Sequence, residues 1–212
     1  MTGAKVRRLR RVALAGMLAL ALCAYGIRVW RVHADAVRYP VELYALDEAV
    51  SLDGAFVDTM PPENAEGYSV TLHGVQVTDA AGYLACHGVG AAGLDAAAAA
   101  VPVIDLELEI TNDSDDGGDV SAVNVFGWLL FCDADDSYYR VDTSLWSQVE
   151  RGVSDGQAYV AVHPHTSYTV HVPFAAGIVT GDARVDGVRP GPYALSLTSI
   201  PTRKTIGFEL AG

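Results

Sequence analysis

The sequence predicts an all-β fold, an antiparallel β-sandwich, preceded by one N-terminal helix that inserts into a membrane. Three observations support this prediction. Seven or more short segments alternate apolar and polar side chains, and Gly- and Asp-rich turns separate them. Helix signals are few beyond residue 36. The N-terminus is basic and then apolar. We therefore expect a stub and helix over residues 1–36 and one sandwich domain over residues 37–212.

The charge is divided unevenly along the 212-residue chain, whose formal net charge is −12. Residues 1–36 hold seven basic residues and one acidic residue, a net charge of +6, so the remainder carries −18. A domain with so few Lys and Arg side chains is a poor binder of phosphate, which excludes nucleic acid as a partner. Half of the residues are hydrophobic, so the chain does not have the composition of a disordered protein.

Residues 12–27, from Val12 to Ile27, form an uncharged run between basic residues. As a helix it spans about 24 Å, slightly less than a hydrocarbon core of about 30 Å. Trp30 suits the headgroup region, and the basic N-terminus orients the following domain outside the cytoplasm. We expect an uncleaved, single-pass signal anchor in the cell membrane.

Two other fates of this N-terminal segment stay open. One is a cleaved signal peptide, with weak cleavage sites at residues 24–26 and 34–36. The other is lipoprotein processing at Cys23, which the large Leu22 before the cysteine disfavours. A buried soluble helix fits poorly with an extreme N-terminal run that is apolar on all sides.

Cys86 and Cys132 remain once Cys23 is set aside. Outside the cell they can form one disulfide, which closes a loop of 47 residues and stabilises the fold by roughly 3–4 kcal/mol. Two free buried thiols are the alternative. Neither cysteine belongs to a C-x-x-C pattern, so redox catalysis is not indicated.

The run over residues 105–111 shows the strand pattern most clearly, because acidic and apolar side chains alternate with a period of two. The side chains expected to face the core are Leu106, Leu108 and Ile110. Those expected to face water are Asp105, Glu107 and Glu109. Glu107 and Glu109 are thus paired carboxylates on one face, which is typical of a solvated sheet surface rather than of acid–base chemistry.

The other elements follow in chain order. Residues 68–77 alternate with a change of phase at Gly74, which indicates a β-bulge. Short helices are expected over residues 80–87 and 91–100, the second capped by Asp95. Further strands are expected over residues 120–131, 167–172, 193–197 and 206–210. Pro173 is expected to end the second of these four strands, residues 167–172.

Several segments taken together resemble a bacterial family of exported ectodomains of unknown function. They are residues 44–50, 66–72, 110–114, 129–139, 166–174 and 193–204. The resemblance implies an immunoglobulin-like β-sandwich over about residues 40–210, held to the membrane by an N-terminal helix or a lipid, and it supplies no catalytic residues. One departure is His165, where the family often has glycine in the turn before a strand.

His163, His165 and His171 are the candidate metal ligands. Pro164 separates the first two in an extended segment, and an acid from Asp133, Asp135 or Asp136 can complete a zinc or copper site. The alternative is that these histidines are exposed side chains of a turn and a strand.

The acidic turn that contains Asp113, Asp115, Asp116 and Asp119 is a second candidate ion site. These carboxylates offer oxygen ligands for Ca²⁺, but their spacing departs from the EF-hand loop. A solvated hairpin turn is the favoured interpretation.

The chain carries no nucleophile elbow, no reactive-cysteine signature and no phosphate-binding glycine loop. We therefore expect a non-enzymatic, extracytoplasmic binding module without a cofactor. Its acidic surface favours a cationic protein or peptide, with loops 113–119 and 133–138 as the contact regions. The alternatives are a metal-binding envelope protein or metal-dependent hydrolase that uses the three histidines, and an accessory subunit of a membrane transporter.

Overall fold

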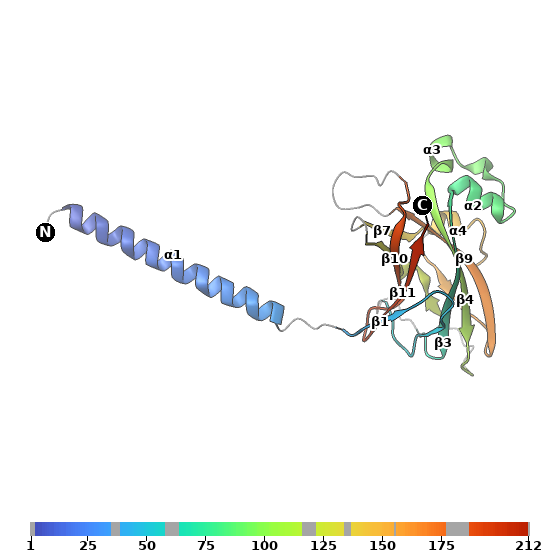
Figure 1. Cartoon of the computed structure of the whole chain (residues 1–212), viewed down its shortest axis with the longest axis horizontal. Helices are drawn as coiled ribbons and strands as arrows, with labels where there is room; N and C mark the ends of the chain where they lie inside the picture. Colours follow the sequence, from blue (N-terminus) through green and yellow to red (C-terminus); the bar gives the residue numbers. More distant parts are fainter. Residues whose placement is uncertain are drawn as a thin grey trace. The chain divides into compact units, whose positions relative to one another are not determined.

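The structure is a computed structural model, and it describes residues 3–34, 39–57, 64–115, 122–133, 137–154, 156–176 and 187–211. The chain divides into two compact units, Met1–Arg38 and Tyr39–Gly212. The first unit consists of the helix α1 (Gly3–Ala34), and the second contains all the strands (Figure 1).

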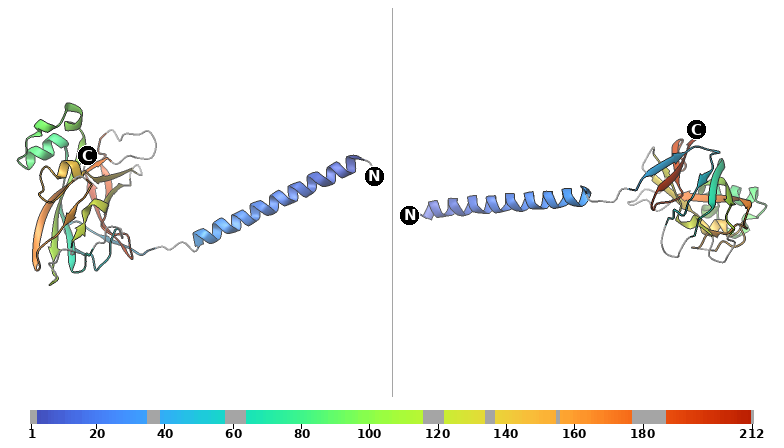
Figure 2. Two further views of the ribbon diagram at one scale, coloured as in Figure 1. Left: turned by 180° about the vertical axis from the view of Figure 1, so that it is seen from behind. Right: turned by 90° about the horizontal axis from the view of Figure 1, so that it is seen from below.

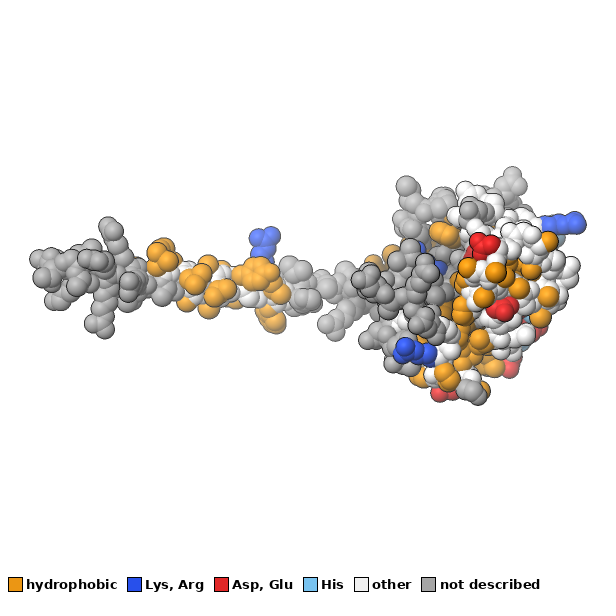
Figure 3. All heavy atoms as spheres, turned by 90° about the horizontal axis from the view of Figure 1, so that it is seen from above, with side chains coloured by type: hydrophobic (Ala, Val, Ile, Leu, Met, Phe, Trp, Pro, Cys, Tyr) orange, Lys and Arg blue, Asp and Glu red, His pale blue; other side chains and the backbone are white. Residues whose placement is uncertain are grey.

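Helix α1 includes the run that the sequence predicts to be a membrane anchor. Apolar side chains of this run are exposed along the helix, among them Leu20 with 72% of its surface accessible (Figure 3). In the part of the chain that the structure describes, no helix is long and apolar enough to cross a membrane. The prediction of a transmembrane anchor over residues 12–27 is therefore not confirmed.

Most of the second unit is one nine-stranded sheet with the strand order β1-β11-β10-β6-β7-β9-β4-β3-β2. The strands are β1 (Val41–Tyr44), β2 (Val50–Ser51), β3 (Tyr68–Asp79), β4 (Pro102–Asn112), β6 (Leu129–Cys132), β7 (Ser137–Val141), β9 (Thr166–Ala176), β10 (Gly191–Ser196) and β11 (Arg203–Leu210). Neighbouring strands pair antiparallel, except that β1 runs parallel to β11. A separate pair joins β5 (Val123–Asn124) to β8 (Tyr159–Val160).

The sheet curls so far that its two ends approach each other (Figures 1 and 2). The segment after β2 reaches the segment before β11, where the backbone of Phe56 exchanges hydrogen bonds with Ile200. The concave side encloses a large apolar core that includes Trp128, Trp146 and Phe174. The prediction of an all-β domain is confirmed as far as a domain of mostly antiparallel β-sheet, whereas the expected sandwich and its immunoglobulin-like arrangement are not shown.

Two expected strands differ from the structure. Residues 120–131 were expected as one strand, but β5 gives way to the turn η2 (Val125–Gly127) before β6 begins. Pro173 does not end β9, which continues to Ala176. The Pro173 carbonyl still accepts a hydrogen bond from the backbone N–H of Asp142, so the missing proline donor does not prevent pairing.

Two details of the sequence are explained by the backbone. The register of β3 against β4 shifts between Leu72 and Gly74, which confirms the expected bulge. His165 has a φ of 56°, in the left-handed region that glycine adopts most easily. That conformation is the physical reason why glycine suits this turn.

The residues between β3 and β4 form a small helical layer that covers the outer face of the sheet. It contains α2 (Ala80–Cys86), η1 (Ala91–Gly93) and α3 (Ala96–Ala99), at one end of the strands (Figures 1 and 2). The side chain of Asp79 caps α2 by accepting a hydrogen bond from Gly82, and Asp95 caps α3 as expected. Tyr83 and Leu84 pack there with Val103 of β4 in a second, smaller apolar cluster.

Candidate metal centre

A buried carboxylate lies beneath two imidazoles where α2 covers β4 and β9. His87 follows the last residue of α2, Asp105 lies on β4 and His171 on β9. The Asp105 Oδ2 atom is 3.4 Å from His87 Nε2 and 3.2 Å from His171 Nδ1. One ligand atom from each residue lies within 4.8 Å of the other two.

The burial of Asp105 contradicts its expected exposure. Alternation along β4 does place it on the outer face of the sheet, together with Glu107, but only 5% of its surface is accessible. The reason is α2, which covers this end of the outer face and also buries Val103 completely. Beyond this layer the acids are only half-buried, as a solvated face requires.

The electrostatics of Asp105 are unfavourable in the metal-free protein. Burial raises the pKa of this carboxyl above its usual value, and the two histidines oppose that shift. The Oδ1 atom is buried without a hydrogen-bond partner. A buried polar atom in this state costs about 1–3 kcal/mol.

Tyr83 holds the two histidines in place. Its hydroxyl donates a hydrogen bond of 2.9 Å to the backbone carbonyl of His171, and its ring centroid is 4.7 Å from that of His87. The two imidazole rings are themselves 4.6 Å apart. Burial, assisted by the negative Asp105, raises the pKa of Tyr83, so the hydroxyl stays neutral.

The three histidines that the sequence suggested do not form one site. His171 joins the centre described above, but His165 lies before β9 and contacts the exposed Asp115 at 2.9 Å. The two histidines are six positions apart along the chain, about 20 Å when the chain is extended. His163 is exposed. Among the described residues, the structure therefore brings only His171 of the three into a group of possible ligands.

The expected acidic partners are also elsewhere. Asp133 lines a shallow surface groove of about 340 Å³ with Phe131 and Arg203, on the outer face near β1. Asp135 and Asp136 lie outside the described residues, and so do Asp116 and Asp119 of the suggested calcium turn. Of the expected binding loops, residues 116–119 of the first and residues 134–136 of the second likewise fall outside them.

Cys86 and Cys132 are both free thiols in the structure. Cys86 is exposed at the end of α2, and Cys132 is buried in β6. The disulfide that the sequence allowed is therefore not formed, and of the expected free buried pair only Cys132 is buried.

The paired carboxylates of β4 have different surroundings. Glu109 lies 3.1 Å from His73 Nε2, while Asp47 lies 2.9 Å from the Nδ1 atom of the same ring. Hydrogen bonds to Asp47 and Glu109 raise the pKa of His73, which favours its protonated form. His73, Asp47 and Glu109 therefore form an exposed cluster of ion pairs at the surface. Glu107 turns toward Gly74 of β3.

Sequence reasoning missed His87 and Asp105 as candidate ligands. From the sequence, His87 is only the end of a short helix, and Asp105, 18 residues on, is one of three acids on a strand face. No spacing motif joins them to His171. The one available signal for this site was a histidine at the end of a helix that precedes a strand with acidic residues. That signal is weak, because it does not indicate which residues come together.

Comparison with known proteins gives two matches. Residues 41–204 match the model of a family described as a domain of unknown function, DUF5028. A secreted protein from Mycobacterium tuberculosis, MPT63, has a solved structure that matches 82% of this chain and 99% of its own, with 15% sequence identity and a TM-score of 0.38. No curated protein matches the chain.

Proposed function

The chain belongs to the DUF5028 family, and we propose that it is an exported domain that binds a divalent transition-metal ion through His87, Asp105 and His171. The observation that supports this proposal is the convergence of two imidazoles on one buried carboxylate whose second oxygen has no partner. Three separate segments supply these groups, and α2 covers Asp105, whereas the side chain of His171 is 38% accessible, which leaves an ion a path from solvent.

The distances suit a tetrahedral ion. Bonds of about 2.0–2.1 Å at a tetrahedral centre separate neighbouring ligand atoms by about 3.3 Å. The observed separations from Asp105 Oδ2 are 3.4 Å to His87 Nε2 and 3.2 Å to His171 Nδ1. The third separation, between the two histidine ligand atoms, is within 4.8 Å, so the two imidazoles would close on the ion as it binds.

The ligand types favour zinc or copper. Two imidazole nitrogens with one carboxylate oxygen suit Zn²⁺ and Cu²⁺, whereas Ca²⁺ and Mg²⁺ prefer oxygen ligands alone. Tyr83 limits the movement of both histidines, because it packs on the ring of His87 and its hydroxyl holds the backbone carbonyl of His171.

A purely structural role explains the centre less well. Val103, the neighbour of Asp105 on the same strand face, packs under α2 as an apolar side chain and is completely buried. An apolar residue at position 105 would extend that contact without desolvating a charge. An ion bound to the carboxylate, by contrast, compensates for the desolvation.

Calorimetric titration of the purified full chain with Zn²⁺ is expected to show one ion bound per chain. Replacing a ligand should weaken binding at least 100-fold in His87→Ala and in His171→Ala, because each substitution removes one of three protein ligands. The matched control is His163→Ala, which removes an exposed histidine outside the centre.

Cys86→Ser is a second control, because this exposed thiol precedes His87 and is itself a zinc ligand type. It should bind Zn²⁺ as the unaltered chain does. Equal binding by His87→Ala, His171→Ala and the unaltered chain would show that the ion, if it binds, binds elsewhere.

The proposed location rests on the N-terminal residues, where five basic residues precede an apolar run. We propose that this segment exports the domain and holds it at the membrane surface. In a bacterial host, alkaline phosphatase fused after Gly212 should be active, because that enzyme needs the oxidising environment outside the cytoplasm. An inactive fusion, compared with one that carries an authentic signal sequence, would contradict export.

A further inference from the structure

Glu107 is the carboxylate nearest in the sheet to the proposed metal centre, and the inference below rests on the metal-binding function. Residue 107 follows Asp105 by two positions on β4, so both side chains leave the same face of the sheet. Glu107 is also the direct cross-strand partner of His171 on β9. Side chains of such a pair start about 4.5–5.5 Å apart at their Cβ atoms.

In the structure the Glu107 carboxylate points toward the other neighbouring strand. On β3 its cross-strand partner is Gly74, and a Cβ atom added at Gly74 would lie 2.9 Å from Glu107 Oε2. Gly74 on β3, Glu107 on β4 and His171 on β9 are therefore neighbours in one row across the sheet. The carboxylate rests over the glycine because no side chain occupies that position.

A change of the Glu107 χ1 angle from one staggered position to another swings its carboxylate from the β3 side to the β9 side. Glu107 is only half-buried, so the movement does not require the core to rearrange. The described residues of the centre supply three ligands, whereas a closed tetrahedral site has four.

We propose that Glu107 is the fourth ligand, and that its carboxylate moves from Gly74 to the metal when the ion binds. The loaded site then consists of His87, Asp105, Glu107 and His171. Its two carboxylates balance the charge of a divalent ion. The ion and its four ligands together are therefore neutral, at the edge of the helical layer.

Titration of the full chain with Zn²⁺ tests the proposal through two matched substitutions. Glu107→Gln should weaken Zn²⁺ binding at least tenfold, because an amide is a poor zinc ligand. Glu109→Gln removes the same charge from the same strand face, two residues further on, and should leave the affinity unchanged. The comparison separates ligation from the general effect of an acidic surface.

The outcomes distinguish this inference from the function on which it rests. If Glu107→Gln binds as tightly as the unaltered chain while His171→Ala does not, the fourth position belongs to water or to another residue, and the inference is wrong. If the unaltered chain binds no Zn²⁺, the metal-binding function itself is wrong. Equal losses in Glu107→Gln and Glu109→Gln would also reject ligation by Glu107.

Gly74→Ala gives an independent test in the opposite direction. The added methyl group occupies the resting place of the carboxylate, which is the far end of a flexible side chain, and the backbone of Gly74 is outside the left-handed region. The substitution should displace Glu107 toward His171 and strengthen Zn²⁺ binding several-fold. Weaker binding in a variant whose thermal unfolding is unchanged would contradict the proposal.

Discussion

Replacing Lys204 by glutamate is expected to abolish cooperative folding of the domain. Lys204 lies on β11, beside the edge of the sheet, and only 5% of its surface is accessible. Its ammonium group donates hydrogen bonds to the backbone carbonyl of Ser51, on the opposite edge strand β2, and to Asp53. The side chain therefore ties together the two ends of the curled sheet.

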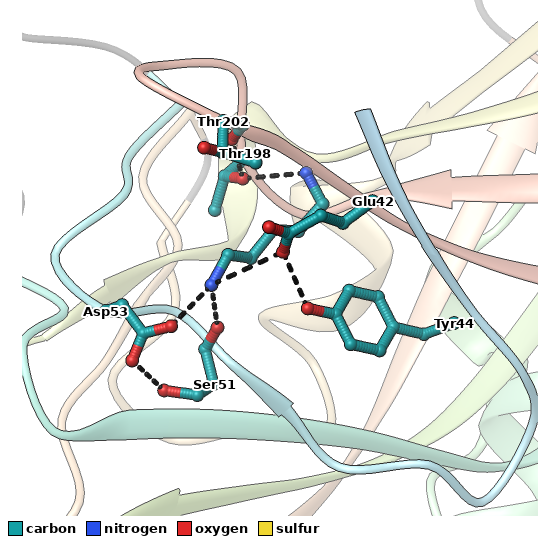
Figure 4. A network of polar contacts seen from close by, with 7 residues as sticks. Glu42, Tyr44, Ser51, Asp53, Thr198 and Thr202 are labelled. Carbon is teal, nitrogen blue, oxygen red and sulfur yellow. Dashed lines mark hydrogen bonds and ion pairs between the residues drawn. The ribbon is translucent and has the colours of Figure 1, made fainter. Parts of the chain in front are cut away.

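Figure 4 shows the acceptors that surround this ammonium group. Asp53 Oδ2 lies 2.7 Å from Lys204 Nζ, and Glu42 Oε2 of β1 lies 3.9 Å from it. Hydrogen bonds from Lys204 and then from Ser51 lower the pKa of Asp53. Tyr44 donates to Glu42, and that hydrogen bond is the main reason why the pKa of Tyr44 is raised to about 12.

A glutamate at position 204 places a buried negative charge among these acceptors with no cation to pair with. A charge buried at position 204 without a partner costs about 3–5 kcal/mol, and repulsion from Asp53 and Glu42 adds to that. Because small domains are stable by about 5–15 kcal/mol in total, most of this stability is lost. Urea unfolding followed by the fluorescence of the buried Trp128 and Trp146 measures the effect.

Lys204→Met is the matched control, since it keeps the unbranched stem and removes only the charge. Asp53 and Glu42 have exposed carboxylates that water solvates once the lysine is gone. We therefore expect a loss of about 1–2 kcal/mol, close to that of one or two hydrogen bonds. Similar unfolding midpoints for Lys204→Glu and the unaltered chain would mean that the edges of the sheet close without this contact.

Asp105→Asn is expected to stabilise the metal-free protein while it weakens Zn²⁺ binding at least 100-fold. The amide has nearly the shape of the carboxyl group but no charge, so the desolvation that raises the pKa of Asp105 disappears. The gain should be about 1–2 kcal/mol, because one buried polar atom still lacks a partner. A stabilising substitution that removes binding is typical of a functional site.

The stability that Asp105→Asn gains over the unaltered chain increases with pH. Because the pKa of Asp105 is higher in the folded chain than in the unfolded chain, the folded state keeps the proton longer as the pH rises. The unaltered chain therefore loses stability relative to Asp105→Asn once the pH exceeds the unfolded pKa of about 3.9. The difference in the free energy of unfolding between the two chains becomes constant once the pH exceeds the pKa of Asp105 in the folded chain.

Thermal unfolding in a chelating buffer, at pH 4 and pH 8, checks this expectation. At pH 8 the unfolding temperature of Asp105→Asn should exceed that of the unaltered chain, and the two should converge at pH 4. Asp115→Asn, which changes an exposed carboxylate, controls for the loss of one negative charge. A lower unfolding temperature for Asp105→Asn at pH 8 would show that the carboxylate stabilises the metal-free fold.

The strand pattern was predictable because alternation is local. Leu106, Leu108 and Ile110 are completely buried as the sequence indicates, and the bulge lies at Gly74 where the pattern changes phase. The break in residues 120–131 was not predictable, since a continuous apolar run does not show where a chain turns inside a core. The candidate ligands were predictable only in part. His171 belongs to the group of possible ligands, but the extended strand β9 separates it from His165.

The sequence by itself determined the β-rich domain after residue 36, the acidic outer face of β4 and the short capped helices between β3 and β4, because each depends on neighbours within a few residues. Only the tertiary structure decided that α2 folds over that face. This contact buries Asp105 while Glu109 stays in water, and it brings His87 and His171 to the same carboxylate oxygen. Alternation specifies which side of a strand a residue occupies, but what covers that side depends on contacts between distant parts of the chain.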